Sequence, residues 1–123
     1  MSLQIKRIYQ PASPLDGDRI LVDRLWPRGV SKKAAHLDSW LKDVAPTPEL
    51  REWFDHRADR WEEFRTRYRA ELLRNPAFAN LCKFIAAHDV TLLYGAKDPN
   101  HNHALVLAEA VEAALHLKHL SPG

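Results

Sequence analysis

The stretch RILVDRLWPRGVSKK (Arg19–Lys33) is the part of the chain around which the rest is organised. Its first part, Arg19–Leu25, reads as an apolar strand, and the rest holds charges, a tryptophan, a proline and a glycine. A strand that ends in cations, an indole and backbone-shaping residues is typical of a site. The candidate site residues in this stretch are Asp23, Arg24, Trp26, Arg28 and Lys32.

The length and composition indicate one globular domain spanning residues 1–123. A chain of 123 residues, 46% of them hydrophobic, can bury a core of its own. Four tryptophans, four phenylalanines and three tyrosines argue against intrinsic disorder. The net charge of +2 is only a weak indication of nucleic-acid binding.

The single cysteine, Cys82, excludes an intrachain disulfide and the usual structural zinc sets. Its place on an apolar helix face predicts a buried, inert thiol. No run approaches the roughly 18 apolar residues of a membrane span, and the N-terminus lacks an apolar signal core. We therefore expect a cytoplasmic protein with no membrane partner.

Three segments have the composition of strands: Leu3–Tyr9, Arg19–Leu25 and the apolar run Val90–Tyr94, which suits a buried central strand. Between the first two lies Gln10–Asp18, whose two prolines and Asp-Gly pair predict a turn. A link of nine residues is short for a parallel crossover. The first two strands could therefore run antiparallel or parallel.

Helical periodicity dominates the remaining chain. The predicted helices are Leu37–Val44, a helix opened by Thr47-Pro48, Asp59–Leu73, a helix opened by Asn75-Pro76, and His103–Leu117. In the first of these, the apolar residues recur at i, i+3, i+4 and i+7. Strands and helices together predict an α/β fold: a small, mainly parallel sheet flanked by helices in a single domain.

A second candidate loop follows Val90–Tyr94 and leads into the last helix. If this strand and Arg19–Leu25 are parallel neighbours, both loops lie at the carboxyl edge, where open α/β sheets bind ligands. The unpaired N–H groups and positive dipole at a helix start favour an anion, and Arg or Lys side chains supply cationic donors. The candidates in this second loop are Tyr94, Gly95, Lys97, Asn102 and His103.

Several of these residues also have a purely structural interpretation. Arg24 and Arg28 could pair with aspartates near the strand end, and Trp26 could be a core residue. His101 and His103 could bind a metal, but the pair lacks carboxylate partners. We therefore predict a helix-start role for the two histidines and no metal site.

The chain carries none of the signatures GxGxxG, GxxxxGK[ST], GxSxG and HExxH. P-loop, serine-hydrolase and zincin chemistry are therefore unsupported, and no cofactor is predicted. The segment Arg51–Arg74 is rich in arginine, but its glutamates offset these charges, which predicts a solvated helical face.

Four motifs carry a family resemblance: LVDRLWPRG (Leu21–Gly29), LDSWLKDVAPTPELREWF (Leu37–Phe54), WEEFRTRYRAEL (Trp61–Leu72) and TLLYGAKDPNHNHA (Thr91–Ala104). Together they resemble the YeaO-like members of domain-of-unknown-function family 488, which are small bacterial proteins. The resemblance covers nearly the whole chain. It implies that the two loop-bearing strands are parallel, and it implies no particular activity.

Longer relatives in that wider family have a pattern VDVRxxP and later CxExxPxxCHR. The chain is similar to it at Asp23, Pro27 and His103. It departs at the two cysteines, the glutamate and the arginine, where it has Tyr94, Asn102, Ala96 and Ala104. The resemblance thus implies a strand–loop–helix geometry that keeps His103 without those groups.

The leading hypothesis is a site for a small phosphate- or nucleotide-like anion. The arginines and Lys97 would neutralise the ligand, and Trp26 would stack on it or wall it. If the protein is an enzyme, a hydrolase or transferase acting on a phosphorylated or nucleoside-like compound fits best, with Asp23 or His103 as the base. The alternative is a non-catalytic module for nucleic acid or a protein, which predicts a continuous positive surface.

Overall fold

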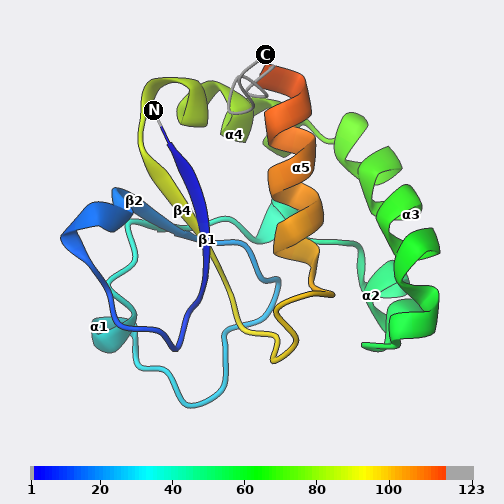
Figure 1. Cartoon of the computed structure of the whole chain (residues 1–123), viewed down its shortest axis with the longest axis horizontal. Helices are drawn as coiled ribbons and strands as arrows, with labels where there is room; N and C mark the ends of the chain where they lie inside the picture. The colour runs from blue at the N-terminus through cyan, green and yellow to red at the C-terminus, as the bar shows by residue number, and fades with distance from the viewer. Residues whose placement is uncertain (1, 116–123) are drawn as a thin grey trace.

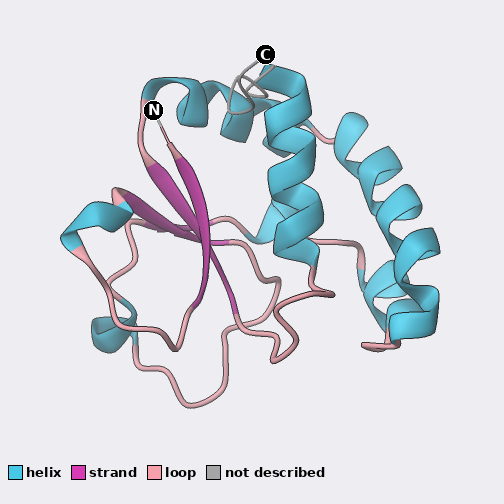
Figure 2. Ribbon diagram, in the orientation of Figure 1, coloured by secondary structure: helices cyan, strands magenta, loops and turns pink. Residues whose placement is uncertain are grey.

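The computed structural model describes residues 2–115, which form a four-stranded parallel sheet with helices packed on it (Figures 1 and 2). The strands are β1 (Leu3–Arg7), β2 (Asp18–Leu21), β3 (Ser39–Trp40) and β4 (Val90–Tyr94). The helices are α1 (Lys32–Ala35), α2 (Pro48–Phe54), α3 (Trp61–Leu73), α4 (Pro76–Ala87) and α5 (His103–Leu115). Short 3-10 helices cover Pro14–Asp16, Lys42–Val44 and Ala58–Arg60. The expected α/β class is confirmed.

Strand β4 occupies the centre of the sheet, whose order is β1-β4-β2-β3. All five of its residues are buried, because it is covered on both faces. Both of its neighbours run parallel to it, with Leu92 opposite Ile5 of β1 and opposite Ile20 of β2. The first two strands are therefore parallel and not adjacent, and the antiparallel option is wrong. The connection from β1 to β2 skips one position in the sheet, and the more apolar β4 occupies that position between them.

The two faces of the sheet are covered differently. On one face Ile20 and Leu92 belong to the main core, which they share with residues of α3, α4 and α5; α5 packs on β1 and β4 (Figure 1). On the other face Leu21 and Leu93 form a smaller core that is completed by irregular segments and α1. The loop after β2 therefore packs against the sheet as part of this second layer.

A buried ion cluster holds the turn before β2. The Asp16 carboxylate, 3% exposed, accepts from Arg19 Nη1 at 2.6 Å and from Lys6 Nζ at 3.0 and 3.1 Å. The Ser13 N–H also donates to it at 3.0 Å. Burial raises the pKa of Asp16, but this N–H and the two cations outweigh burial and hold the pKa below its ordinary value.

The predicted helix Leu37–Val44 is wrong, because this segment forms the edge strand β3 and a 3-10 turn. The edge of β2 offers unpaired backbone groups, and the segment satisfies them. Asp38 N–H donates to Arg19 O at 2.8 Å, and Arg19 N–H donates to Asp38 Oδ2 at 2.7 Å. Leu41 N–H donates to Leu21 O at 2.9 Å. Tertiary hydrogen bonding overrides the helical spacing here.

The other helices follow their local signals. Thr47 caps α2 by accepting from Leu50 N–H, and Asn75 caps α4 by accepting from Ala77 N–H. The last predicted helix agrees through Leu115; its final two residues lie outside the described part. Cys82 is buried on α4, and burial raises the pKa of its thiol. None of the helices within residues 2–115 is long and apolar enough to cross a membrane.

Candidate functional site

The loops that follow β2 and β4 meet at the carboxyl edge of the sheet. The Gly95 N–H donates to Asp23 Oδ2 at 2.9 Å, which joins the start of one loop to the start of the other. A Cβ on Gly95 would lie 2.9 Å from the same oxygen and 3.4 Å from Pro27 Cβ. A side chain at position 95 would therefore require the Asp23 carboxylate to shift.

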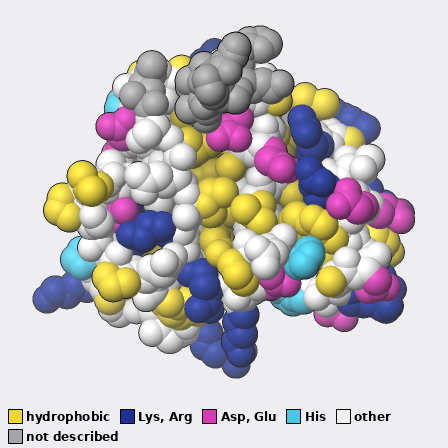
Figure 3. Space-filling model, viewed as in Figure 1, with side chains coloured by type: hydrophobic (Ala, Val, Ile, Leu, Met, Phe, Trp, Pro, Cys, Tyr) yellow, Lys and Arg dark blue, Asp and Glu magenta, His cyan; other side chains and the backbone are white. Residues whose placement is uncertain are grey.

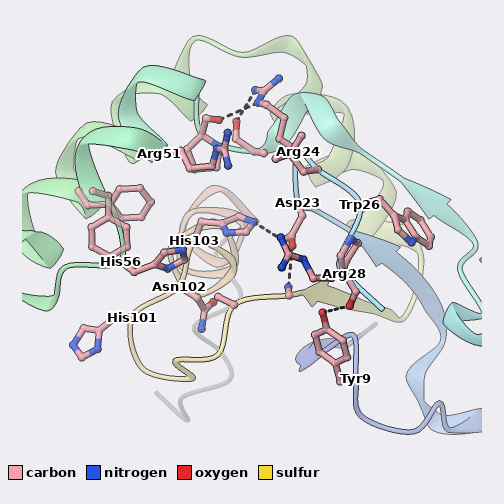
Figure 4. Close-up of a pocket in the computed structure, with 18 residues that line it drawn as sticks. Tyr9, Asp23, Arg24, Trp26, Arg28, Arg51, His56, His101, Asn102 and His103 are labelled. Carbon is pink, nitrogen blue, oxygen red and sulfur yellow. Dashed lines mark hydrogen bonds and ion pairs between the residues drawn. The ribbon is translucent and has the colours of Figure 1, made fainter. Parts of the chain in front are cut away.

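A pocket of ≈ 330 Å³ opens where the loops meet (Figure 4). This volume lies at the lower end of the range, about 300–1,000 Å³, of small-molecule sites. The pocket is lined by Tyr9, Asp23, Arg24, Leu25, Trp26, Pro27, Arg28, Ala45, Pro46, Arg51, Phe54, His56, Phe64, Gly95, Ala96, His101, Asn102 and His103. Predicted members of both loops thus share one cavity.

Asp23 and His103 form the polar centre of the pocket, joined by a dashed line in Figure 4. His103 Nε2 lies 3.0 Å from Val22 O and 3.2 Å from Asp23 Oδ1. The first approach is a hydrogen bond; the second is an ion-pair distance without hydrogen-bond alignment, and Asp23 Oδ1 has no other donor in the described chain. The two side chains are 17% and 16% exposed, so the pair is largely shielded from water.

The two arginines of the first loop do not pair with aspartates within residues 2–115. The Arg24 guanidinium donates to Pro46 O at 3.2 Å and to Ala45 O at 3.3 Å, which ties the loop to the segment before α2. Arg28 is exposed, and its carbonyl accepts from the Tyr9 hydroxyl at 2.7 Å. The guanidinium of Arg28 is thus the one left for a ligand in this loop.

Trp26 and Asn102 line the pocket and also have structural tasks. Trp26 Nε1 donates to Val30 O at 2.6 Å, and its ring meets Trp40 edge-on at 5.2 Å. The Asn102 oxygen accepts from Leu105 N–H at 3.1 Å and caps α5. Both side chains shape the cavity through these fixed positions.

Three of the predicted site residues do not line the pocket: Lys32, Tyr94 and Lys97. Lys32 begins α1, and both lysines are exposed. Tyr94 belongs to the main core, and burial raises the pKa of its phenol. Figure 3 shows Lys and Arg side chains along the lower edge of the molecule, below the strand ends of Figure 1.

Sequence reasoning missed Arg51 and His56, which reach the pocket from α2 and the turn after it. Asp55 and His56 both have positive φ, 47° and 55°, which bends the chain there. Phe54 and Phe64, stacked with ring centroids 4.3 Å apart, also line the cavity. No local pattern links these residues to the two loops, because they meet only through packing.

His101 and His103 contact different partners. His101 Nδ1 lies 2.8 Å from Asp98 Oδ2, and its ring meets Trp61 edge-on at 5.3 Å. The Asn100 N–H and His101 lower the pKa of Asp98. Within residues 2–115, no group of three or more His, Cys, Asp and Glu side chains could hold a metal ion.

The fold and the pocket define an α/β protein with a parallel sheet and an arginine-lined cavity at its carboxyl edge. The chain belongs to the YeaO-like proteins of the DUF488 family: the family model described as "Inactive DUF488-N3 subclade" matches residues 2–122. It is 46% identical to the uncharacterised protein YeaO of Escherichia coli K12 over 110 residues, which cover 89% of this chain and 96% of that protein.

A second relative is the uncharacterised protein Rv3073c of Mycobacterium tuberculosis H37Rv. It is 41% identical over 107 residues, which cover 87% of this chain and 91% of that protein. No solved structure matches the chain.

Proposed function

We propose that this protein binds a small anion of the phosphate or nucleotide kind in the pocket at the carboxyl ends of β2 and β4. The observation that carries the proposal is the charge of the lining, which has three arginines and one carboxylate. Two of the arginines, Arg28 and Arg51, are exposed and have no ion pair within residues 2–115. A planar guanidinium suits the oxygens of a phosphate or carboxylate.

The rest of the lining supports a ligand that carries a ring beside its charge. Phe54, Phe64, Trp26 and His56 place flat or apolar surface on the cavity. A nucleobase or similar heterocycle packs well against such surface. The volume of ≈ 330 Å³ suits a single small molecule.

Binding without catalysis is the form of this function that we favour. The matched family description contains the word "Inactive". The described lining has no Ser, Thr or Cys that could act as a nucleophile. The chain also departs from the pattern of its longer relatives at Tyr94, Ala96, Asn102 and Ala104.

A hydrolase or transferase is the second candidate, and the approach of His103 to Asp23 favours it. An imidazole held beside a carboxylate can act as a general base on water. Turnover of phosphate monoesters or nucleotides that is lost in His103→Gln would select this candidate over simple binding.

The ion pairs of α3 argue against the alternative function, a nucleic-acid-binding module. Arg65 pairs with Glu62 at 3.2 Å and with Glu109 at 2.9 Å, and Arg67 pairs with Glu63. Arginines that are already neutralised contribute little to phosphate binding.

A cytoplasmic location is part of our proposal, and the lone cysteine supports it because secreted chains of this size commonly use disulfides.

Titration with inorganic phosphate, AMP and GMP, followed by amide NMR shifts and calorimetry, tests the proposal. Arg28→Ala and Arg51→Ala should each weaken binding by about tenfold or more, since a hydrogen bond to a charged group contributes about 1.5–3 kcal/mol. Lys33→Ala removes an equal charge from an exposed side chain of α1, outside the pocket, and should leave the affinity within about twofold.

The proposal is overturned if the amide resonances of Gly95, Asn102 and His103 do not shift at ligand concentrations well above about 1 mM, the weak end of specific affinity. Equal losses in Arg28→Ala and Lys33→Ala would also count against it, because they would point to the general surface charge.

A further inference from the structure

The surroundings of the His103 ring decide which of its two nitrogens carries a proton. Nε2 lies 3.0 Å from Val22 O, and a backbone carbonyl can only accept a hydrogen bond. Nε2 must therefore be protonated in every charge state of the ring. The Asp23 carboxylate, 3.2 Å from the same nitrogen, favours that proton electrostatically.

The other ring nitrogen, Nδ1, makes no hydrogen bond with any residue in 2–115. The His103 ring lines the pocket, with Nε2 directed toward Asp23 (Figure 4). In the neutral ring Nδ1 is an acceptor, and in the imidazolium it is a donor. Nδ1 is thus the nitrogen through which the ring can reach a ligand.

A proton must lie between Nδ1 and any oxyanion that contacts it, because two acceptors facing each other repel. The imidazolium can supply this proton, or a hydroxyl of the ligand can donate it to the neutral ring. A phosphate that retains a P–OH group can use the second route at any pH where it keeps that proton. Sulfate has no proton near neutral pH and depends on the first route alone.

We propose, resting on the anion-binding function proposed above, that His103 Nδ1 contacts the bound anion and that Asp23 is a positioning residue for this ring. The pocket then prefers a phosphate-type oxyanion that bears a hydroxyl to a fully deprotonated oxyanion of the same shape. The ligand class is narrowed to inorganic phosphate and to phosphorylated compounds with a hydroxyl beside the bound oxygens.

Other groups near His103 bear on any pH dependence. From α3, the Tyr68 ring lies 6.3 Å from the His103 ring, and burial raises the pKa of this phenol, so it stays neutral. The remaining charged or titratable side chains that share the pocket are Asp23, Arg24, Arg28, Arg51, Tyr9, His56 and His101. Histidine is the side chain type that commonly changes charge near neutral pH, so the other two imidazoles of the pocket are the groups to control for.

The first test reads the tautomer without a ligand. Long-range ¹H–¹⁵N spectra of histidine-labelled protein should show neutral His103 with the proton on Nε2 and a bare Nδ1. Asp23→Asn places an amide N–H toward either Nε2 or the Gly95 N–H, so it should disturb this tautomer or the Gly95 amide shift. A proton on Nδ1 in the neutral wild-type ring would overturn the inference.

The second test compares inorganic phosphate with sulfate, two tetrahedral anions of matched size. Between pH 6 and pH 8, sulfate affinity should fall more steeply with rising pH than phosphate affinity, because Nδ1 can donate to sulfate only when it carries a proton. Phosphate keeps a P–OH over this range, so its affinity should change by less than about threefold. Equal pH dependence of the two anions would overturn the inference.

The variants assign the effect to one atom. In His103→Gln the amide can still donate to Val22 O but offers nothing in place of Nδ1, so the difference between the anions should vanish. His56→Gln removes another imidazole of the same pocket, and the difference should persist in it whatever the affinity. Loss of the difference in His56→Gln, or its retention in His103→Gln, overturns the assignment.

The two proposals fail in different ways. If both anions shift the Gly95 and Arg28 resonances without the predicted pH difference, the role of His103 is wrong and anion binding stands. If neither anion binds at any pH, both the proposed function and the ligand preference are wrong.

Discussion

Replacing Asp16 by asparagine removes the negative charge at the centre of the buried cluster on the second face of the sheet. Arg19 is 5% exposed and donates to Asp16 at 2.6 Å, so the change leaves its guanidinium without a counter-charge. Removing one partner of a buried ion pair lowers stability by about 3–5 kcal/mol. Asparagine keeps one acceptor oxygen, and Arg19 keeps its bond to Ala35 O at 3.0 Å, so we expect about 2–3 kcal/mol of lost stability.

The pH dependence of this loss has a definite sign. The folded-state pKa of Asp16 is lowered by the Ser13 N–H, Lys6 and Arg19 despite burial. A carboxyl group of this kind contributes stability that is present above its unfolded pKa and lost as pH falls through its folded pKa. The difference between wild type and Asp16→Asn should therefore be constant between about pH 7 and pH 5 and shrink below about pH 4.

Urea unfolding at several pH values measures this difference directly. Asp18→Asn is the matched control: it is the same chemical change two residues along, at a side chain with no ion pair within residues 2–115. A loss below about 1 kcal/mol in Asp16→Asn, or an equal loss in Asp18→Asn, would refute the reasoning, because the cost would then not come from the cluster.

Three further experiments test the local structure. Gly17→Ala should lower the free energy of unfolding by about 2–4 kcal/mol, because Gly17 has φ 65° and a Cβ would lie 2.3 Å from a backbone oxygen. Gly29→Ala should lower it by only about 1 kcal/mol, because Gly29 has φ 79° but open space around its Cβ position. Equal shifts in the melting temperatures of the two variants would contradict this expectation. Asn102→Ala removes the cap on Leu105 N–H and should lower the free energy of unfolding by about 1 kcal/mol, with an unchanged urea midpoint as the contrary result. Cys82 is 7% exposed and its pKa is raised by burial, so a thiol reagent should label it only after unfolding; rapid labelling of the native protein would show that the thiol is accessible.

Much of the secondary structure could be predicted from the sequence because its signals are local. The run Val90–Tyr94 is a strand as predicted, and the caps Thr47 and Asn75 begin their helices. These features depend on residues within about four positions of one another. The helix prediction for Leu37–Val44 was wrong because the hydrogen-bond partners of this segment, Arg19 and Leu21, belong to another strand.

The candidate site could be predicted only in part. Parallel neighbouring strands bring their carboxyl ends to one edge, so the sequence predicted that the two loops share an edge if their strands are neighbours, whereas the contact of Asp23 with Gly95 came only from the structure. Arg51 and His56 lie far along the chain from both loops, and only the packing of α2 brings them to the cavity. Lys97, by contrast, belongs to the second loop and does not line the pocket.

The amino-acid sequence alone was enough for the fold class, for most helix starts and for the two loops that hold Asp23 and His103. Strand order, the fate of the Leu37–Val44 segment and the partners of Arg24 were decided by the tertiary structure. The reason is physical: caps and periodicity act between near neighbours, whereas β4 takes the centre because both of its faces must be buried. The orientation of the His103 ring is also a tertiary property, since the carbonyl oxygen that lies 3.0 Å from its Nε2, Val22 O, comes from a residue 81 positions earlier in the chain.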